Sequence, residues 1–257
     1  METVQYDVRD RIGYITLNRP EKRNALNEDL IRSLSATFDK AAGDSTVKVI
    51  VLKGNGEAFC SGADLAYIQQ MQNFSFDDNF SDSTRLKDLF YKIYTLNKVV
   101  IAQVEGHAIA GGCGLATVCD FIFSVPEAKF GYTEVRIGFI PAIVMVFLIR
   151  KIGEQRARQL LLSGNLIGAN EAAQLGLITS IVPKENIATT VLDFANKLIK
   201  SNSTEAMTTT KQMIADVQSL PLDEALSYAA RMNADARGTA DCKKGIAGFL
   251  NKQTPEW

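Results

Sequence analysis

The chain has 257 residues, of which 46% are hydrophobic and 22% are charged, and its formal net charge is −1 at neutral pH. A chain of this length and composition can bury a large core within one domain, or within one domain that carries a small appendage. The balanced charge excludes an overall basic field that would attract nucleic acid or an anionic membrane.

The sequence contains four cysteines and one histidine, His107. No two cysteines form a C-x-x-C pair and none is clustered with the histidine, which argues against a zinc site and against a disulfide framework. A catalytic triad could use only His107. The simpler interpretation is that the His107 imidazole is hydrogen-bonded in a loop or in the core. We therefore expect no metal, no cofactor and reduced, mostly buried thiols.

The start of the sequence and its most apolar stretch predict neither export nor membrane insertion. The first residues lack a positively charged leader followed by an apolar run, so we expect a cytoplasmic protein. The most apolar stretch, residues 137–149, contains Pro141 and is shorter than the roughly 20 residues that span a bilayer. A buried helix is the prediction for that stretch.

The first elements follow a strand, helix, strand order. Residues 4–8 and 12–17 alternate apolar and polar side chains around a short polar connection, which predicts a hairpin. Residues 28–42 carry apolar side chains at helical spacing, and residues 48–52 form a continuous apolar run typical of a buried strand.

The next segment, residues 72–85, is rich in Asn, Asp, Ser and Phe without a clear period. It predicts a mobile loop or a lid over a site, with a simple surface excursion as the alternative. Helical spacing returns over residues 86–95, and strands are predicted over 99–104 and 120–124.

From residue 154 onward the sequence is predominantly helical, and the last predicted strand covers residues 178–182. Repeated strand and helix units followed by a helical tail indicate an α/β core with a C-terminal helical region. We place the core in residues 1–195 and the helical region in residues 196–257.

Two glycine-bearing loops carry the strongest chemical signal: residues 59–65 (FCSGADL) and residues 110–115 (AGGCGL). Each follows a strand-like run and begins a helix-like one, so their backbone N–H groups could converge on one oxygen. Glycine lets a substrate approach the backbone closely. The pair predicts an oxyanion hole, whereas either loop alone would be read as a tight, closely packed turn.

Together with residues 17–26 (LNRPEKRNAL) and 130–141 (FGYTEVRIGFIP), these loops resemble the crotonase family, also called the enoyl-CoA hydratase/isomerase family. The resemblance extends from about residue 4 to residue 257. It implies an α/β fold built as a spiral of ββα units, with residues 196–257 as a helical trimerisation region. It also implies an acyl-CoA substrate and a homotrimer or homohexamer. From the charge balance and the short apolar stretch we expect neither nucleic acid nor membrane as partner.

The same resemblance assigns the chemistry. The backbone N–H groups of Ala63 and Gly111 would be the oxyanion donors, and Glu134 would be the acid–base group. Apolar neighbours of Glu134 are expected to raise its pKa toward the range useful for proton transfer. The alternative is a surface glutamate paired with Arg136 or Lys129.

Contacts with the acyl-CoA are implied for residues of both loops, of the C-terminal helix and of a basic turn formed by Lys22 and Arg23. The basic turn could also be merely solvated, and Lys252 could be a plain surface charge. In the family the aromatic and the lysine of the terminal helix, here Phe249 and Lys252, often reach CoA across a subunit boundary. The implied substrate-binding residues are Lys22, Arg23, Ala25, Ala63, Asp64, Leu65, Gly111, Gly114, Phe249 and Lys252.

Gly114 departs from the family pattern, because hydratases of the family commonly carry a second glutamate at this position. A single glutamate is compatible with hydration and equally with a 3,2-enoyl-CoA isomerase. A non-hydrating acyl-CoA-binding protein and the RNA binding of some relatives are further alternatives, although the charge balance gives RNA binding no support.

Residues 130–153 look most like the methylglutaconyl-CoA hydratase branch of the family, which acts in leucine degradation. A substrate of that kind carries a free carboxylate, so a basic or amide group should enter the acyl site. Arg85 and Arg136 are two candidates for that group.

Overall fold

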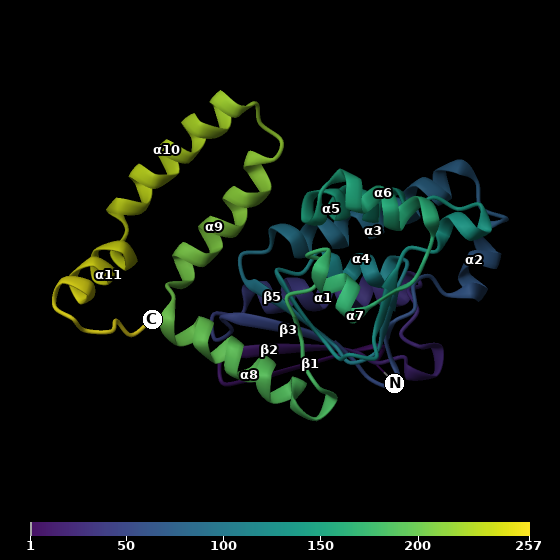
Figure 1. Ribbon diagram of the computed structural model, residues 1–257, viewed down its shortest axis with the longest axis horizontal. Helices are drawn as coiled ribbons and strands as arrows, with labels where there is room; N and C mark the ends of the chain where they lie inside the picture. The colour runs from purple at the N-terminus through teal and green to yellow at the C-terminus, as the bar shows by residue number, and fades with distance from the viewer. Residues whose placement is uncertain (1) are drawn as a thin grey trace.

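The computed structural model describes residues 2–257, in which the strands form two sheets (Figure 1). In the larger sheet the first two strands are antiparallel and the others are parallel. Its order is β1 (Val4–Arg9), β2 (Ile12–Leu17), β3 (Val49–Gly54), β5 (Val99–Val104), β7 (Phe121–Ser124) and β10 (Ser180–Ile181). The smaller sheet has the order β4 (Ala58–Cys60), β6 (His107–Ile109), β8 (Lys129–Gly131) and β9 (Ile167–Gly168).

From β3 to β8, successive strands alternate between the two sheets, and a helical segment follows each pair. After β3 and β4 come α2 (Leu65–Met71) and α3 (Phe76–Thr95), and after β5 and β6 comes α4 (Gly111–Thr117). After β7 and β8 come η2 (Glu134–Ile137), α5 (Ala142–Ile152) and α6 (Glu154–Ser163). This arrangement is the predicted spiral of ββα units. Because β4, β6 and β8 are parallel neighbours, the segments that follow them collect at one edge of the smaller sheet.

The remaining helices lie around and beyond this spiral. They are η1 (Pro20–Lys22), α1 (Glu28–Gly43), α7 (Ala169–Gln174), α8 (Lys184–Ser201), α9 (Thr204–Val217), α10 (Leu222–Gly238) and α11 (Ala240–Leu250). In Figure 1, α9, α10 and α11 project from the body as a separate arm. A cleft of about 1360 Å³ separates this arm from the body. The predicted boundary at residue 195 lies inside α8.

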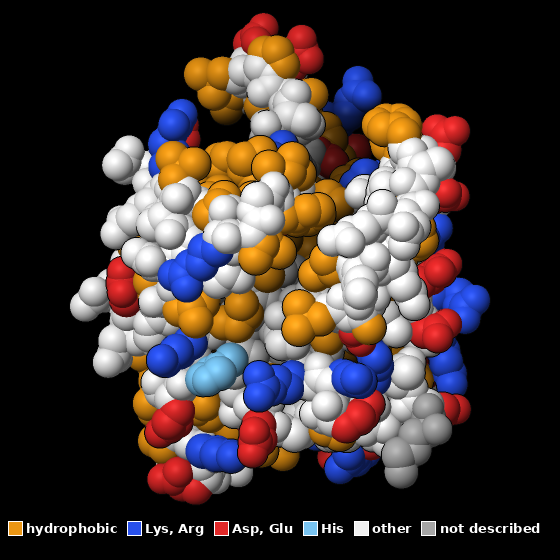
Figure 2. Space-filling view, turned by 90° about the vertical axis from the view of Figure 1, so that its right-hand side faces the viewer, with side chains coloured by type: hydrophobic (Ala, Val, Ile, Leu, Met, Phe, Trp, Pro, Cys, Tyr) orange, Lys and Arg blue, Asp and Glu red, His pale blue; other side chains and the backbone are white. Residues whose placement is uncertain are grey.

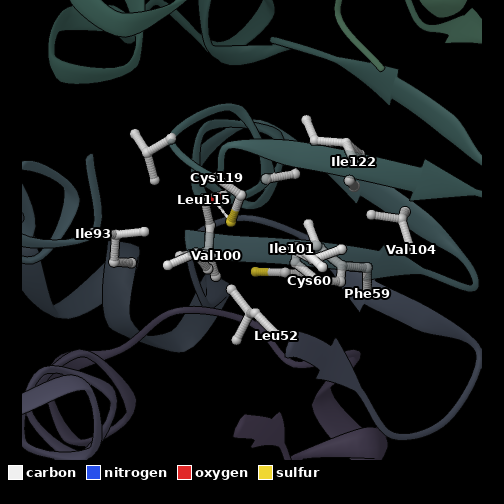
Figure 3. Close-up of a cluster of buried hydrophobic side chains, with 14 of the residues drawn as sticks. Leu52, Phe59, Cys60, Ile93, Val100, Ile101, Val104, Leu115, Cys119 and Ile122 are labelled. Carbon is white, nitrogen blue, oxygen red and sulfur yellow. Dashed lines mark hydrogen bonds between the residues drawn. The ribbon is translucent and has the colours of Figure 1, made fainter. Parts of the chain in front are cut away.

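The central strand β5 is buried along its whole length. Figure 3 shows Val100, Ile101 and Val104 from this strand among buried side chains that include Cys60 of β4, Leu115 of α4 and Cys119, which follows α4. Burial raises the pKa of these two thiols to about 12, which makes them unreactive. All four cysteines are free and three are buried, as predicted.

Two segments differ from the sequence predictions. Residues 76–85 are helical rather than a mobile loop, because α3 begins at Phe76 behind a capping box made by Ser75 and Asp78. The apolar stretch 137–149 is not one buried helix, since α5 begins only at Ala142 and Ile137 lies exposed before it. In residues 2–257, no helix has both the length and the apolarity needed to cross a bilayer.

Three buried lysines join distant elements, which the sequence did not indicate. The amino groups of Lys48, Lys98 and Lys211 donate to the last carbonyls of α8, α1 and α3, at 2.5 to 3.0 Å. Each lysine thus stabilises the end of a helix, where carbonyls lack partners. Lys211 also forms a 2.7 Å ion pair with Asp120, and this carboxylate accepts the N–H of Val100.

Replacing Lys211 with Met should therefore lower the free energy of unfolding by about 3 kcal/mol, because it leaves the Asp120 charge without its partner. Urea unfolding measures the change. Lys200→Met, the same substitution at an exposed position of α8, should stay within about 0.5 kcal/mol of the parent. Equal effects of the two variants would contradict a structural role for Lys211.

Candidate functional site

The loop that follows β4 is fixed by pairing with Leu26. The Leu26 N–H donates to the Gly62 carbonyl at 2.7 Å, and the Leu26 carbonyl accepts from the Asp64 N–H at 2.8 Å. These bonds make a parallel bridge between Leu26 and Ala63, so the N–H of Ala63 points to the opposite side. Ala63 is exposed, and its N–H has no acceptor within residues 2–257.

The start of α4 supplies a second N–H of this kind. Ala110 has φ +51° and ψ −125°, a conformation that costs an alanine about 1–3 kcal/mol, and its N–H donates to the Gly131 carbonyl at 2.7 Å. The sharp turn begins α4 at Gly111, whose N–H also lacks an acceptor in the described part of the chain. Such backbone strain is typical of functional sites.

The two loops are in contact. A methyl group on Gly62 would lie 2.9 Å from the Ala110 Cβ and 3.6 Å from the Gly111 nitrogen. A methyl group on Gly112 would lie 2.1 Å from the Cys60 carbonyl oxygen, so only glycine lets α4 approach β4 this closely. The fold thus brings the two predicted loops together.

Glu134, the first residue of η2, is half-buried next to α4. The preceding Tyr132 is fully buried, and its hydroxyl lies 2.8 Å from the Thr117 hydroxyl on α4, which fixes η2 against this helix. The Glu134 Oε2 atom is buried and has no hydrogen-bond partner among residues 2–257. Burial raises the pKa of Glu134 above its ordinary value.

The alternative reading of Glu134 as a surface ion pair finds no support. No ion pair joins it to Arg136 or Lys129 in the described residues. Arg136 instead bonds to the side chain of Asn165 at 3.1 Å. A buried, unpartnered carboxyl group with a raised pKa is suited to proton transfer.

Hydrocarbon fills the space around Gly114. A Cβ atom at this position would lie 2.2 Å from Val144 Cγ1 and 2.9 Å from Phe90 Cε2. Gly114 lies one turn beyond Gly111 on α4. The site therefore leaves no room for a second carboxylate at Gly114.

Asp64 and Leu65, two predicted substrate contacts, take different positions. Asp64 is buried, forms a 3.0 Å ion pair with Arg19 and caps α2 by accepting the Ala66 N–H. Its interactions hold the loop in shape. Leu65 is 81% exposed on α2.

The predicted basic turn is also held rigidly. Arg23 and Asn24 both adopt positive φ angles, +50° and +54°. The buried Asn24 side chain donates to the carbonyls of Asn55, just after β3, and Ala58, the first residue of β4. Lys22 and Arg23 are exposed, whereas Ala25 is buried. The polar interior contacts of Asn24 and Arg19 were not predicted.

Figure 2 shows the side of the molecule on which α2 lies. Hydrophobic side chains gather in the upper half around a hollow, and Lys and Arg side chains lie below, beside the single histidine. Apolar residues that are exposed on α2 and around η2 include Leu65, Ile137, Phe139 and Ile140. An apolar hollow beside a basic rim suits a ligand with an apolar part and a phosphate-bearing part.

The last two predicted residues do not join this site within one chain. Phe249 is 84% exposed at the end of α11, and Lys252 follows the same helix. Figure 1 places α11 at the opposite end of the molecule from α2. These residues could reach such a site only in another copy of the chain.

Comparison with known proteins gives consistent results. The family model described as "Enoyl-CoA hydratase/isomerase" matches residues 7–257. The mitochondrial enoyl-CoA hydratase of Pongo abelii is 36% identical, covering 94% of this chain and 82% of its own. The 2,3-dehydroadipyl-CoA hydratase of Escherichia coli is 33% identical over 96% of this chain and 95% of its own. The crystal structure of an enoyl-CoA hydratase from Mycobacterium smegmatis has a TM-score of 0.93, with 28% identity over 100% of this chain and 99% of that one.

Proposed function

Because this chain belongs to the enoyl-CoA hydratase/isomerase family, we propose that it adds water across the 2,3 double bond of an acyl-CoA thioester. Three features carry the proposal: the Glu134 Oε2 atom without a hydrogen-bond partner among residues 2–257, the link of its segment to α4 through Tyr132, and the contact between the loops whose Ala63 and Gly111 N–H groups have no acceptor there. CoA enters as part of the substrate, and no further cofactor is required by these groups.

The oxyanion donors would act on the thioester carbonyl. Both N–H groups would lie about 3 Å from the thioester oxygen, where negative charge develops as the enolate forms. Backbone donors fixed by the Leu26 bridge and by the Ala110 turn need no rearrangement during the reaction. Such preorganised donors stabilise the transition state more than the ground state.

Glu134 would handle both proton transfers. As a carboxylate it accepts a proton from water while the water oxygen bonds to Cβ, and the double-bond electrons move toward the thioester oxygen. The protonated Glu134 then delivers its proton to Cα, and the enolate collapses to the saturated thioester. A pKa raised by burial favours both steps near neutral pH.

A 3,2-enoyl-CoA isomerase is the second candidate, and the packing around Gly114 favours it. Val144 and Phe90 present hydrocarbon where a second carboxylate could help to hold water. With Glu134 as the sole carboxylate, the same site could remove a proton from C2 of a 3-enoyl thioester and return it to C4.

For the acyl group, we propose 3-methylglutaconyl first, on the sequence resemblance of residues 130–153. Its free carboxylate needs a cation, and the two candidates differ in their surroundings. Arg85 lies 3.3 Å from Asp82 and 3.8 Å from Glu28, so its charge is already compensated. Arg136 has no carboxylate partner in the described residues and is the better candidate.

We also propose a cytoplasmic homotrimer or homohexamer that binds neither nucleic acid nor membrane. The packing of α9–α11 supports this assembly, because α10 and α11 bury none of their residues within their own chain. Assembly would cover these helices and could bring Phe249 and Lys252 to the basic turn of a neighbouring copy.

The absorbance of the conjugated enoyl thioester tests the proposal. Purified protein is incubated in parallel with crotonyl-CoA, 3-methylglutaconyl-CoA and a 3-enoyl-CoA. Falling absorbance with the first two supports hydration and ranks the acyl groups. Rising absorbance with the 3-enoyl-CoA would show that the reaction is isomerisation and not hydration. No change with any substrate would favour a protein that binds acyl-CoA without turning it over.

A further inference from the structure

The short helix α2 is held to the body by few contacts. It begins two residues after Ala63, and none of its side chains is buried. A seven-residue helix is marginal on its own in water, so its position depends on specific tertiary contacts. Whatever fixes α2 therefore fixes one wall of the site next to the thioester position.

The strongest of these contacts is polar. The Tyr67 hydroxyl on α2 donates to Asp82 Oδ1 on α3 at 2.5 Å, and Asp82 is only 6% exposed. Arg85 Nη2 lies 3.3 Å from the same oxygen and balances its charge. Burial and the neighbouring Asp82 raise the pKa of Tyr67 to about 12, so the hydroxyl remains a donor at all physiological pH values. Hydrogen bonds to a charged acceptor of this kind are stronger than neutral ones.

The Ala63 loop is held by different groups. Its shape depends on the Asp64–Arg19 ion pair and on the bridge to Leu26, neither of which involves Tyr67. Loosening α2 should therefore leave the Ala63 N–H in place. Asp64 also caps α2, but the Tyr67–Asp82 hydrogen bond is not among the contacts that hold the oxyanion donors.

The geometry also indicates which part of the ligand the wall meets. Asp82 and Phe90 lie on the buried face of α3, and Phe90 packs beside Gly114 on α4, the helix that begins at Gly111. Because α2 begins two residues after Ala63 and exposes the apolar side chain of Leu65, we expect the wall to border the acyl part of the ligand and not its phosphates.

We propose that Tyr67 and Asp82 are positioning residues: their hydrogen bond fixes α2 as the wall of the acyl site and so sets the affinity for the acyl group. They take no part in proton transfer. This inference rests on the proposed function in one respect only, namely that an acyl-CoA binds beside Ala63 and Gly111.

Tyr67→Phe tests the inference, because it removes the hydroxyl and keeps the ring that packs edge-on against Phe74 at 6.3 Å. Calorimetry with butyryl-CoA, which has no double bond to react, should show a Kd raised about tenfold. The Kd of CoA alone should stay within about twofold of the parent value. In turnover, KM should rise while kcat changes by less than about threefold, since Glu134 and both donors are undisturbed.

Two further variants serve as controls. Asp82→Asn keeps an acceptor for Tyr67 but removes the charge, so its Kd for butyryl-CoA should lie between those of the parent and Tyr67→Phe. Tyr228→Phe removes a similar bond, 2.8 Å to Asp216, between α10 and α9, and should change neither Kd.

Three results would overturn the inference: an unchanged Kd for butyryl-CoA in Tyr67→Phe, an equal loss of affinity for CoA alone, or a fall in kcat at constant KM. The binding data separate this inference from the proposed function. If the parent protein binds butyryl-CoA but turns over no enoyl-CoA, the proposed reaction is refuted, and the binding data still test the role of Tyr67. A parent protein that does not bind butyryl-CoA would refute both.

Discussion

Replacing Glu134 with Gln should lower kcat by about 10²- to 10⁴-fold, the usual contribution of a positioned acid–base group. The amide keeps the shape of the side chain but can neither accept a proton from water nor deliver one to Cα. KM should change little, because the contacts with the thioester are made by the backbone of Ala63 and Gly111. The assay is the enoyl-thioester absorbance, and near-parent turnover by a folded variant would show that Glu134 is not the acid–base group.

The stability of the same variant checks its fold and the state of the carboxyl group. Burial raises the pKa of Glu134 above its ordinary value of 4.5. At pH values between 4.5 and the raised pKa, the folded protein therefore retains a proton that the unfolded chain has lost. Stability of the parent should therefore fall as pH rises through this window, whereas Gln cannot ionise. Glu134→Gln should match the parent near pH 4 and unfold at higher urea concentration near pH 8. A variant less stable than the parent at pH 8 would contradict the raised pKa.

The parts of the fold that could be predicted are those with a clear local period. The β1–β2 hairpin and α1 show regular alternation or helical spacing, and both occur where predicted. The first half of α3 was mistaken for a loop because its residues are nearly all exposed, with Asp82 as the buried exception. Its capping box was a local signal that could have identified the helix start at Phe76.

The site was predictable to the extent that short motifs specify it. The structure brings the Ala63 and Gly111 loops together and leaves the Oε2 atom of Glu134 without a hydrogen-bond partner among residues 2–257. The supporting contacts were not predictable, because they join side chains far apart in the sequence. The Tyr67–Asp82 hydrogen bond and the packing of Val144 on Gly114 leave no trace in local spacing.

Gly114→Glu should destabilise the protein by more than about 4 kcal/mol, because it combines overpacking with a buried charge. Its Cβ would need the position of Val144 Cγ1, only 2.2 Å away, and Phe90 blocks the other side at 2.9 Å. Urea unfolding measures the loss. Gly43→Glu is the matched control, since apart from the adjoining backbone no atom of residues 2–257 lies within 4 Å of a Cβ there, and it should cost less than about 1 kcal/mol.

A double-mutant cycle then shows whether Val144 is what restricts this site to one carboxylate. Val144→Gly alone leaves a cavity and should destabilise the protein, but combined with Gly114→Glu it removes the clash. The two changes should therefore be strongly non-additive, with the double variant more stable than Gly114→Glu alone by about 2 kcal/mol. Faster hydration of crotonyl-CoA by the double variant than by Val144→Gly would mean that the new carboxylate helps to hold water opposite Glu134. Additive losses would instead show that the packing around Gly114 is not the obstacle, and that the close contact with Val144 relaxes at little cost.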